Sequence, residues 1–369
     1  MKIMIDISGH GLGHLAQISP LVHEFRSRDR EVRFFVQSKF DHSTLSRFLG
    51  EPIERASDTQ DLGLVMLGPS TVDVERSYNE YAGLHSRFDG VVDLQAHRLK
   101  DCGTELLISD ISYVSLAGAA RAGIPAYAVC SLHWGEVVRQ YFGEREQVAG
   151  ILAEIMDAYN GAARFFVPCP RQSVPDVERQ THVGLMARHW AKPTKAEILA
   201  RAGMTGSRYL GLIGFGGIPH GLPALALPRM ANWAWIIPDA LIGQVETQNR
   251  GDIAPLGRLG SIDYLDILAS CDLVLTKTGY STFAECVTYG VPCLFLSRPD
   301  WPEAPEIERF MEVGGYGLPL SLRELTGRRW FGKAERLLAD RRPAVKPTGH
   351  VEIADRIFAD LGLSCINPT

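Results

Sequence analysis

The 369-residue sequence has no long apolar run, no closely spaced cysteine pair and no excess of basic residues. No apolar stretch approaches the roughly 18 residues that a membrane-spanning helix needs. Seven scattered cysteines without a C-x-x-C pair argue against a disulfide framework and a zinc site. The net charge of −5 disfavours a nucleic-acid partner, and Asp6 interrupts the apolar N-terminus where a secretory leader would need its core. We therefore expect a soluble, cytoplasmic protein with reduced thiols.

What is present is an alternation of short apolar strands and helices that occurs twice. The expected strands span residues 3–7, 32–37, 105–109 and 126–130 in the first half, and 208–213, 233–237, 273–275 and 293–296 in the second. This spacing is typical of βαβ units around a parallel sheet. Residues 167–193 carry four prolines and mixed charges, and we interpret them as the linker between two domains.

The predicted fold class is α/β, with two facing doubly wound, Rossmann-like domains and a cleft between them. The first domain is expected at residues 1–185 and the second at 186–350, each of ordinary domain size. Residues 351–369 contain an amphipathic helix that could cross back to the first domain. We expect a monomer or a homodimer, with ligands outside the carboxyl ends of the strands.

A glycine turn, G-H-G-L-G-H at residues 9–14, follows the first strand. Its glycines permit close backbone approach, and the next helix offers N–H groups at its start. It is no dinucleotide fingerprint, because His14 stands where G-x-G-x-x-G needs glycine. Histidines at this strand end are candidates for chemistry, although a purely structural turn is the alternative. Asp110 ends a later strand, where it could orient a histidine or merely cap the following helix.

The second half repeats the design with Gly214-Phe215-Gly216-Gly217, either a phosphate-facing loop or a plain turn. The richest segment is residues 272–285, where a strand leads through Lys277, Thr278 and Gly279 into a helix. Ser281 and Thr282 at its start favour an anion site, and Glu285 one turn on could accept ribose hydroxyls. A capping arrangement is the alternative.

Further on, an acidic, proline-rich loop contains Asp300, Glu303 and Glu306, whose carboxylates suit sugar hydroxyls or are simply solvated. The sequence also contains no D-x-D triplet, an arrangement that commonly holds a metal ion. We expect no metal and no cofactor. A helix N-terminus, with Lys277, would neutralise a pyrophosphate instead.

Together these segments resemble the GT-B glycosyltransferases. The first half is similar to the glycine-histidine opening of the peptidoglycan N-acetylglucosaminyltransferase and natural-product enzymes, and the second to the glycosyltransferase-like part of plant-type arabinokinases. The matching stretches are G-H-G-L-G-H, L-I-S-D, H-W-G-E (133–136), L-T-K-T-G-Y-S-T-F-A-E and S-R-P-D-W-P-E-A-P-E.

This resemblance implies transfer of a sugar from a UDP- or dTDP-sugar to a small-molecule or lipid-linked acceptor. It implies His14 as general base and Asp110 as its partner, and it puts Gly11, Gly13, His133 and Trp134 on the acceptor side. The donor nucleotide would lie on the second domain, with Glu285 at the ribose and Ser281 and Thr282 near the diphosphate.

The sequence departs from these families in three respects. The H-C-G-W-N-S donor motif of plant-type glycosyltransferases is absent, so uracil recognition does not carry over. Proline comes later after His14 than in those families, which leaves His10 as a rival base. No kinase half is present, and a kinase activity is not expected. A nucleotide-sugar hydrolase or epimerase, and a non-catalytic sugar-nucleotide-binding module, are the other functions that this sequence allows.

Overall fold

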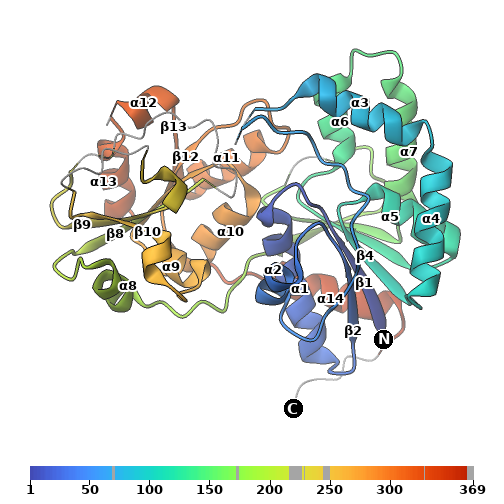
Figure 1. The fold of residues 1–369 in the computed structure, drawn as a ribbon, viewed down its shortest axis with the longest axis horizontal. Coiled ribbons are helices and arrows are strands. Elements are labelled where there is room, and N and C mark those ends of the chain that lie inside the picture. Colours follow the sequence, from blue (N-terminus) through green and yellow to red (C-terminus); the bar gives the residue numbers. More distant parts are fainter. Residues whose placement is uncertain are drawn as a thin grey trace. The chain divides into compact units, whose positions relative to one another are not determined.

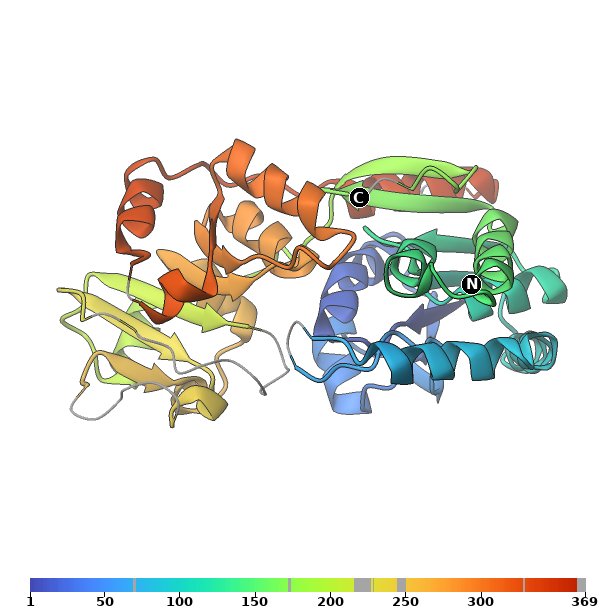
Figure 2. The ribbon, with the colours of Figure 1, turned by 90° about the horizontal axis from the view of Figure 1, so that it is seen from above.

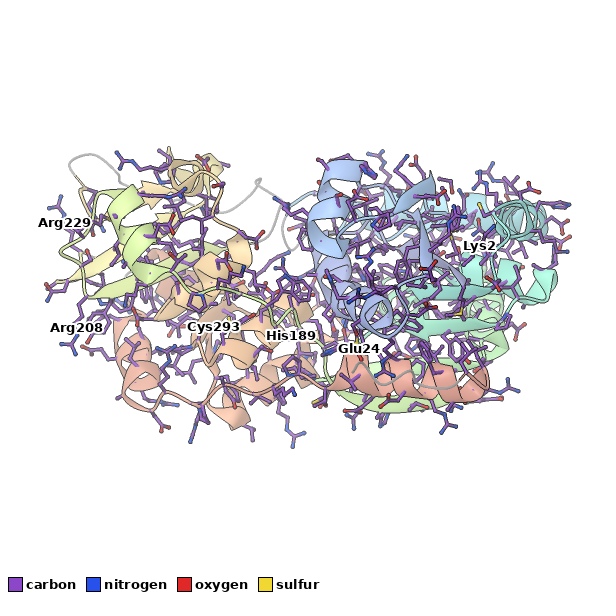
Figure 3. All side chains as sticks on the ribbon, turned by 90° about the horizontal axis from the view of Figure 1, so that it is seen from below. Lys2, Glu24, His189, Arg208, Arg229 and Cys293 are labelled. Carbon is purple, nitrogen blue, oxygen red and sulfur yellow. The ribbon has the colours of Figure 1, made fainter. Side chains whose placement is uncertain are left out.

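The computed structural model describes residues 1–68, 71–171, 174–215, 227, 229–243, 250–327 and 329–363. The chain divides into two compact units. The first unit contains Met1–Met66, Val72–Met186 and Pro347–Thr369, and the second contains Leu67–Thr71 and Ala187–Lys346. Figure 3 draws the side chains, which fill both units. Among the described residues, no helix combines the length and the hydropathy that a membrane crossing requires.

The first unit is built on a seven-stranded parallel sheet with the order β3-β2-β1-β4-β5-β6-β7. Its strands are β1 Lys2–Ile7, β2 Arg33–Gln37, β3 Glu54–Ser57, β4 Leu106–Asp110, β5 Ala126–Val129, β6 Arg164–Cys169 and β7 Gln180–Leu185. Strands β1 and β4 are buried at almost every position, as expected for a sheet covered on both faces.

Helices cover both faces of this sheet (Figures 1 and 2). One group packs α1 against α2 and α14, and the other packs α5 against α4 and α7. Their bounds are α1 Leu12–Arg28, α2 His42–Leu49, α3 Val74–His85, α4 Phe88–Asp101, α5 Tyr113–Ala122, α6 Trp134–Phe142, α7 Val148–Gly161 and α14 Gly349–Asp360. The C-terminal helix α14 thus belongs to the first unit, where Arg28 donates to Asp355 over 2.6 Å.

The second unit has a six-stranded parallel sheet with the order β10-β9-β8-β11-β12-β13. Its strands are β8 Tyr209–Gly214, β9 Trp233–Ile237, β10 Ile253–Pro255, β11 Leu273–Lys277, β12 Cys293–Leu296 and β13 Gly317–Leu320. Its helices are α8 Lys195–Ala202, α9 Tyr264–Ser270, α10 Tyr280–Tyr289, α11 Ala304–Gly314, α12 Leu322–Thr326 and α13 Phe331–Ala339, with 3-10 turns at Asp239–Leu241 and Leu256–Leu259. A stack of Tyr209, Trp233 and Trp235 lies at its core, closed by Trp330. The expected class, two parallel α/β sheets, is confirmed.

The linker expected at residues 167–193 is wrong over most of its length. Strand β6 ends inside it, and β7 lies wholly inside it, paired with β6 at the edge of the first sheet. Pro168 lies in β6, one strand in from the edge, and the β6–β7 register shifts between Pro168 and Cys169, an irregularity of the kind that accommodates proline in a sheet. Pro168 therefore marks a strand irregularity, and the units divide after Met186.

Each sheet has one point at which the strand order reverses. In the first it lies between β1 and β4, and in the second between β8 and β11. Ligands of open parallel sheets bind outside the carboxyl ends of the strands at such a point. The segments that follow these four strands are the places to look for a site.

Candidate functional site

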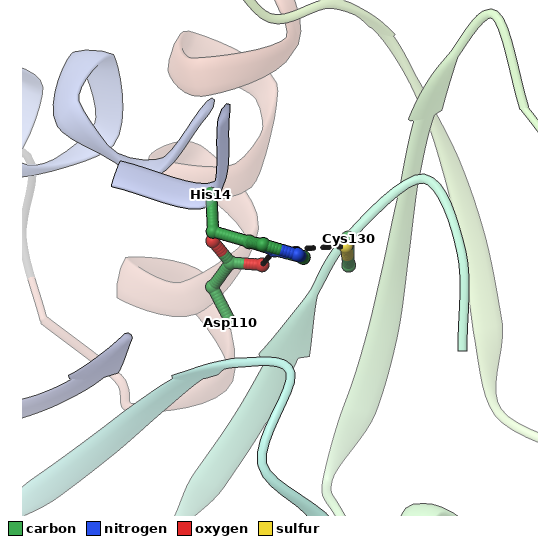
Figure 4. Close-up of side chains that lie close together, drawn as sticks. All are labelled: His14, Asp110 and Cys130. Carbon is green, nitrogen blue, oxygen red and sulfur yellow. Dashed lines mark hydrogen bonds and ion pairs between the residues drawn. The ribbon is translucent and has the colours of Figure 1, made fainter. Parts of the chain in front are cut away.

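His14 and Asp110 meet at the strand-order reversal of the first sheet. The turn after β1 places His14 in the first turn of α1, and Asp110 is the last residue of β4. His14 Nδ1 lies 3.1 Å from Asp110 Oδ1. Figure 4 draws this contact as a dashed line. The His14 side chain is 11% exposed and that of Asp110 is fully buried. A buried carboxylate at this distance can fix the orientation of an imidazole and stabilise its protonated form.

Asp110 does not cap the helix that follows it. The N-cap of α5 is Ser112, whose hydroxyl accepts from the backbone N–H of Ser115. The Asp110 carboxylate instead faces His14, and its second oxygen, Oδ2, is buried without a hydrogen-bond partner among the described residues. The helix-cap alternative for Asp110 is thereby excluded.

Trp134 forms a wall beside both histidines of the glycine turn. Its ring is 5.6 Å from that of His10, edge to face, and 6.4 Å from that of His14. The indole N–H donates to Asp61 over 2.6 Å, and the other oxygen of Asp61 accepts from the Ser8 hydroxyl over 2.5 Å. Asp61 thus ties the turn after β1 to the start of α6. Burial raises the pKa of Asp61, while Ser8, His14 and Trp134 oppose that rise.

His10 has different partners from His14. Its ring nitrogen Nδ1 lies 3.3 Å from the backbone nitrogen of Leu64. The backbone N–H of His10 donates to the Ser8 hydroxyl. Gly63 lies against this ring with a φ of 66°, so a side chain there would be strained and would meet His10 Nδ1 at 2.8 Å. His10 is therefore held by the 61–64 loop, whereas His14 faces Asp110.

The other residues assigned to the acceptor side differ in accessibility. Gly11 is half-buried and Gly13 is exposed, so the turn beside His14 is open to solvent. His133 is fully buried, with its ring against Tyr159 and Phe165. Burial lowers its pKa to about 4, which keeps this histidine neutral at pH 7. His133 therefore lies in the core behind Trp134.

In the second unit, the loop after β11 leads into α10 at the other strand-order reversal. Gly279 precedes α10 without a side-chain cap, and Ser281 and Thr282 are half-buried in its first turn. The Thr278 hydroxyl donates to Glu308, which also accepts from the backbone N–H of Arg298 over 3.1 Å. This arrangement orients the N-terminal end of α10, a position that favours anions.

Lys277 and Gly214 end the two strands at this reversal. Burial, reinforced by nearby Arg298, lowers the pKa of Lys277 to about 8. A side chain at position 214 would collide with the Tyr264 hydroxyl, so the end of β8 requires glycine. Gly216 and Gly217 lie outside the described residues.

Glu285 forms a buried ion pair with Arg188. Arg188 Nε donates to Glu285 Oε1 over 2.6 Å, and the two side chains are 7% and 3% exposed. Burial raises the pKa of Glu285, and Arg188 opposes that rise. Glu285 is therefore not a capping residue of α10, and its carboxylate is held in place by the segment that follows β7.

The three acidic residues of the 298–306 loop differ in their exposure to solvent. Asp300 and Glu306 are exposed, and Glu306 lies 3.9 Å from Arg309. Glu303 is buried just before α11. Arg298 packs over the Trp301 ring at 4.6 Å.

Several residues of both sites have no signal in the sequence. Asp61, Arg188 and Glu308 lie in segments without a motif, and each has a partner 30 or more positions away in the chain: Trp134, Glu285 and Thr278, respectively. Cys130, which follows β5, has its Sγ 4.0 Å from His14 Nδ1.

No protein-family model matches the chain. It is 25% identical over 344 residues to the L-arabinokinase of Arabidopsis thaliana; the match covers 90% of this chain. The chain spans about a third of the length of this relative.

Solved structures match over nearly the whole chain. The calicheamicin glycosyltransferase CalG4 has a TM-score of 0.61 at 17% identity, covering 98% of both chains. The complex of S. aureus MnaA with UDP has a TM-score of 0.59 at 11% identity, covering 100% of this chain and 99% of that one. Structural neighbours include both natural-product glycosyltransferases and UDP-N-acetylglucosamine 2-epimerases. The chain therefore has the GT-B glycosyltransferase fold and is distantly related to arabinokinase.

Proposed function

We propose that this protein transfers a sugar from a UDP- or dTDP-sugar to a hydroxyl or amine of a small-molecule or lipid-linked acceptor. Two of the solved structures with this fold contain such nucleotides, VinC with dTDP and MnaA with UDP. The observation that carries the proposal is the 3.1 Å contact between His14 and the buried Asp110 carboxylate.

His14 is assigned as the general base of this reaction. Because Nδ1 faces Asp110, Nε2 is the nitrogen that takes the proton from the acceptor as the new glycosidic bond forms. Asp110 stabilises the resulting imidazolium and keeps the ring in one orientation.

The donor nucleotide is assigned to the second unit. The start of α10, with Ser281 and Thr282, and Lys277 at the end of β11 would stabilise the departing diphosphate without a metal ion. Glu285, held by Arg188, would accept hydrogen bonds from the ribose. Asp300 and Glu306 are exposed carboxylates available to sugar hydroxyls.

Turnover of UDP- and dTDP-sugars, with and without a panel of alcohol and amine acceptors, tests the proposal. Transfer predicts that nucleoside diphosphate and a glycosylated acceptor accumulate together, only when an acceptor is present. Acceptor-free release of sugar, or conversion to an epimer, would replace transfer by the hydrolase or epimerase function. Binding of nucleotide sugar without turnover of any kind would leave only a sugar-nucleotide-binding module.

A further inference from the structure

Three side chains with different metal-binding atoms converge at the proposed base, which is one of the three. They come from three elements: His14 from α1, Asp110 from the end of β4 and Cys130 from the residue after β5. His14 Nδ1 lies 3.1 Å from Asp110 Oδ1 and 4.0 Å from Cys130 Sγ, and all three atoms lie within 4.8 Å of one another (Figure 4). This nitrogen, oxygen and sulfur set is the kind that Zn²⁺ prefers.

We propose that His14, Asp110 and Cys130 form a binding site for one Zn²⁺ ion. Bonds of about 2.0–2.3 Å place tetrahedral ligand atoms about 3.4–3.6 Å apart. The separations from His14 Nδ1, 3.1 and 4.0 Å, bracket that range, and all three atoms lie within 4.8 Å of one another, so side-chain movements on the order of 1 Å would bring them into position. Sequence spacing gives no sign of this site, because its ligands are spread over residues 14–130.

A second observation points to a cation at the same place. Asp110 is fully buried, and its Oδ2 has no hydrogen-bond partner among the described residues. A buried carboxylate oxygen in this situation is costly unless a positive charge or a proton compensates it. One Zn²⁺ ion balances one carboxylate and one thiolate, so the occupied site would carry no net charge.

The surroundings also suit a metal ion with an open position. Asp110 and Cys130 are buried, whereas His14 is partly exposed, so the fourth ligand position would face the solvent side. The Cys130 thiol donates to Gln17 Oε1 over 3.3 Å, and Gln17 Nε2 donates to the Ser131 hydroxyl over 3.1 Å. Turning the Gln17 amide over would present its NH₂ to a thiolate, while Ser131 donates to its oxygen.

Occupation of this site would inhibit transfer, a consequence that rests on the proposed function. An ion bound to Nδ1 displaces the His14–Asp110 hydrogen bond, and Nε2 is then no longer a base paired with a carboxylate. Bound Zn²⁺ would thus act as an inhibitor of sugar transfer. Binding itself needs no substrate and can be measured even if the protein transfers no sugar.

A titration of the reduced protein with Co²⁺, followed by its absorption spectrum, tests the site. We expect one equivalent to bind with a thiolate-to-Co²⁺ charge-transfer band in the near ultraviolet, which Zn²⁺ abolishes by displacement. Cys130→Ser should remove the band and weaken Zn²⁺ binding in calorimetry at least about tenfold, because even the loss of an outer partner costs that much. Cys169→Ser, at the end of β6 in the same sheet, is the matched control and should keep both.

The spectra decide between the outcomes. A band that survives in Cys130→Ser, or no band at all in the folded wild-type protein, overturns the site. Circular dichroism of both variants shows whether each is folded. If Co²⁺ binds as expected but no donor is turned over, the zinc site stands and the proposed transferase function fails.

Discussion

At the scale of single residues, the first prediction separates the two histidines of the glycine turn. His14→Ala should lower kcat for transfer by about 10²-fold or more with little change in nucleotide affinity, because a general base acts on the chemical step. His10→Ala should have a smaller effect, because His10 is held by the Leu64 backbone and the Trp134 ring, whereas His14 is the histidine that faces the buried Asp110 carboxylate. Steady-state kinetics with the identified donor and acceptor provide the measurement, and His97→Ala on the exposed side of α4 is the control.

Asp110→Asn belongs to the same test. Asp110 acts through His14, so the double variant should be little worse than His14→Ala alone. A large loss of kcat in His10→Ala, together with a small loss in His14→Ala, would assign the general base to His10. The assignment of the fold would be unaffected.

A second residue-scale prediction concerns the buried pair of Arg188 and Glu285. Arg188→Met leaves the Glu285 carboxylate buried without its partner, which should lower the free energy of unfolding by about 3–5 kcal/mol. The double variant Arg188→Met with Glu285→Leu should recover most of that loss, because it removes both charges. Urea denaturation gives the values. The control is Arg121→Met, because Arg121 is exposed and pairs with Asp89 and Asp93 at the surface. This change should lower the free energy of unfolding by only about 0–1 kcal/mol.

At the scale of elements, the core of β1 makes stability depend on pH. Burial raises the pKa of Asp6 from 3.8 to about 7, while the Ser115 hydroxyl that donates to it opposes the rise. Between about pH 4 and about pH 7 the unfolded chain has released this proton and the folded protein retains it, so stability falls as the pH rises. Ionisation of Asp6 in the folded state therefore costs about 4 kcal/mol above pH 7.

Asp6→Asn should remove that slope. The uncharged amide can still accept from Ser115, so this variant should gain stability relative to the wild type between pH 5 and pH 8. Chemical denaturation at pH 5 and at pH 8 measures the free energy of unfolding of both proteins. Asp58→Asn, at an exposed position, should keep the wild-type pH dependence. If Asp6→Asn showed the same slope as the wild type, the pH dependence would belong to other groups.

The elements also show what the sequence could and could not predict. Buried strands such as β1 and β4 have apolar runs, and their expected ranges match within a residue. Strands β3 and β13 are both missing from the expectation. The residues of β3 are mostly exposed and polar, and β13 contains a proline, which argues against a strand. The strand-end pattern pointed to His14 and Asp110, whereas Asp61 and Arg188 act through partners that only the folded chain brings near.

At the scale of the whole molecule, each sheet has its own strand-order reversal and its own candidate site. The expected cleft between the domains stays a prediction. If the α10 N-terminus and Lys277 neutralise the diphosphate, transfer requires no divalent cation. Turnover in excess EDTA should therefore be unchanged, or higher where trace Zn²⁺ occupies His14. A rate lost in EDTA and restored by Mg²⁺ would refute metal-independent transfer.

The last prediction is a division of labour between the two units. A nucleoside diphosphate that binds only the folded second unit should stabilise it by about 2.7 kcal/mol at a hundred times its Kd, which thermal unfolding detects as a rise in Tm. His14→Ala should keep this rise while losing turnover. Glu285→Gln, which keeps the shape and the Arg188 hydrogen bond, should weaken binding by about 1–3 kcal/mol and reduce the rise. Binding should also weaken above about pH 8, where Lys277 loses its proton. A rise that Glu285→Gln leaves unchanged and His14→Ala abolishes would place the nucleotide on the first unit instead.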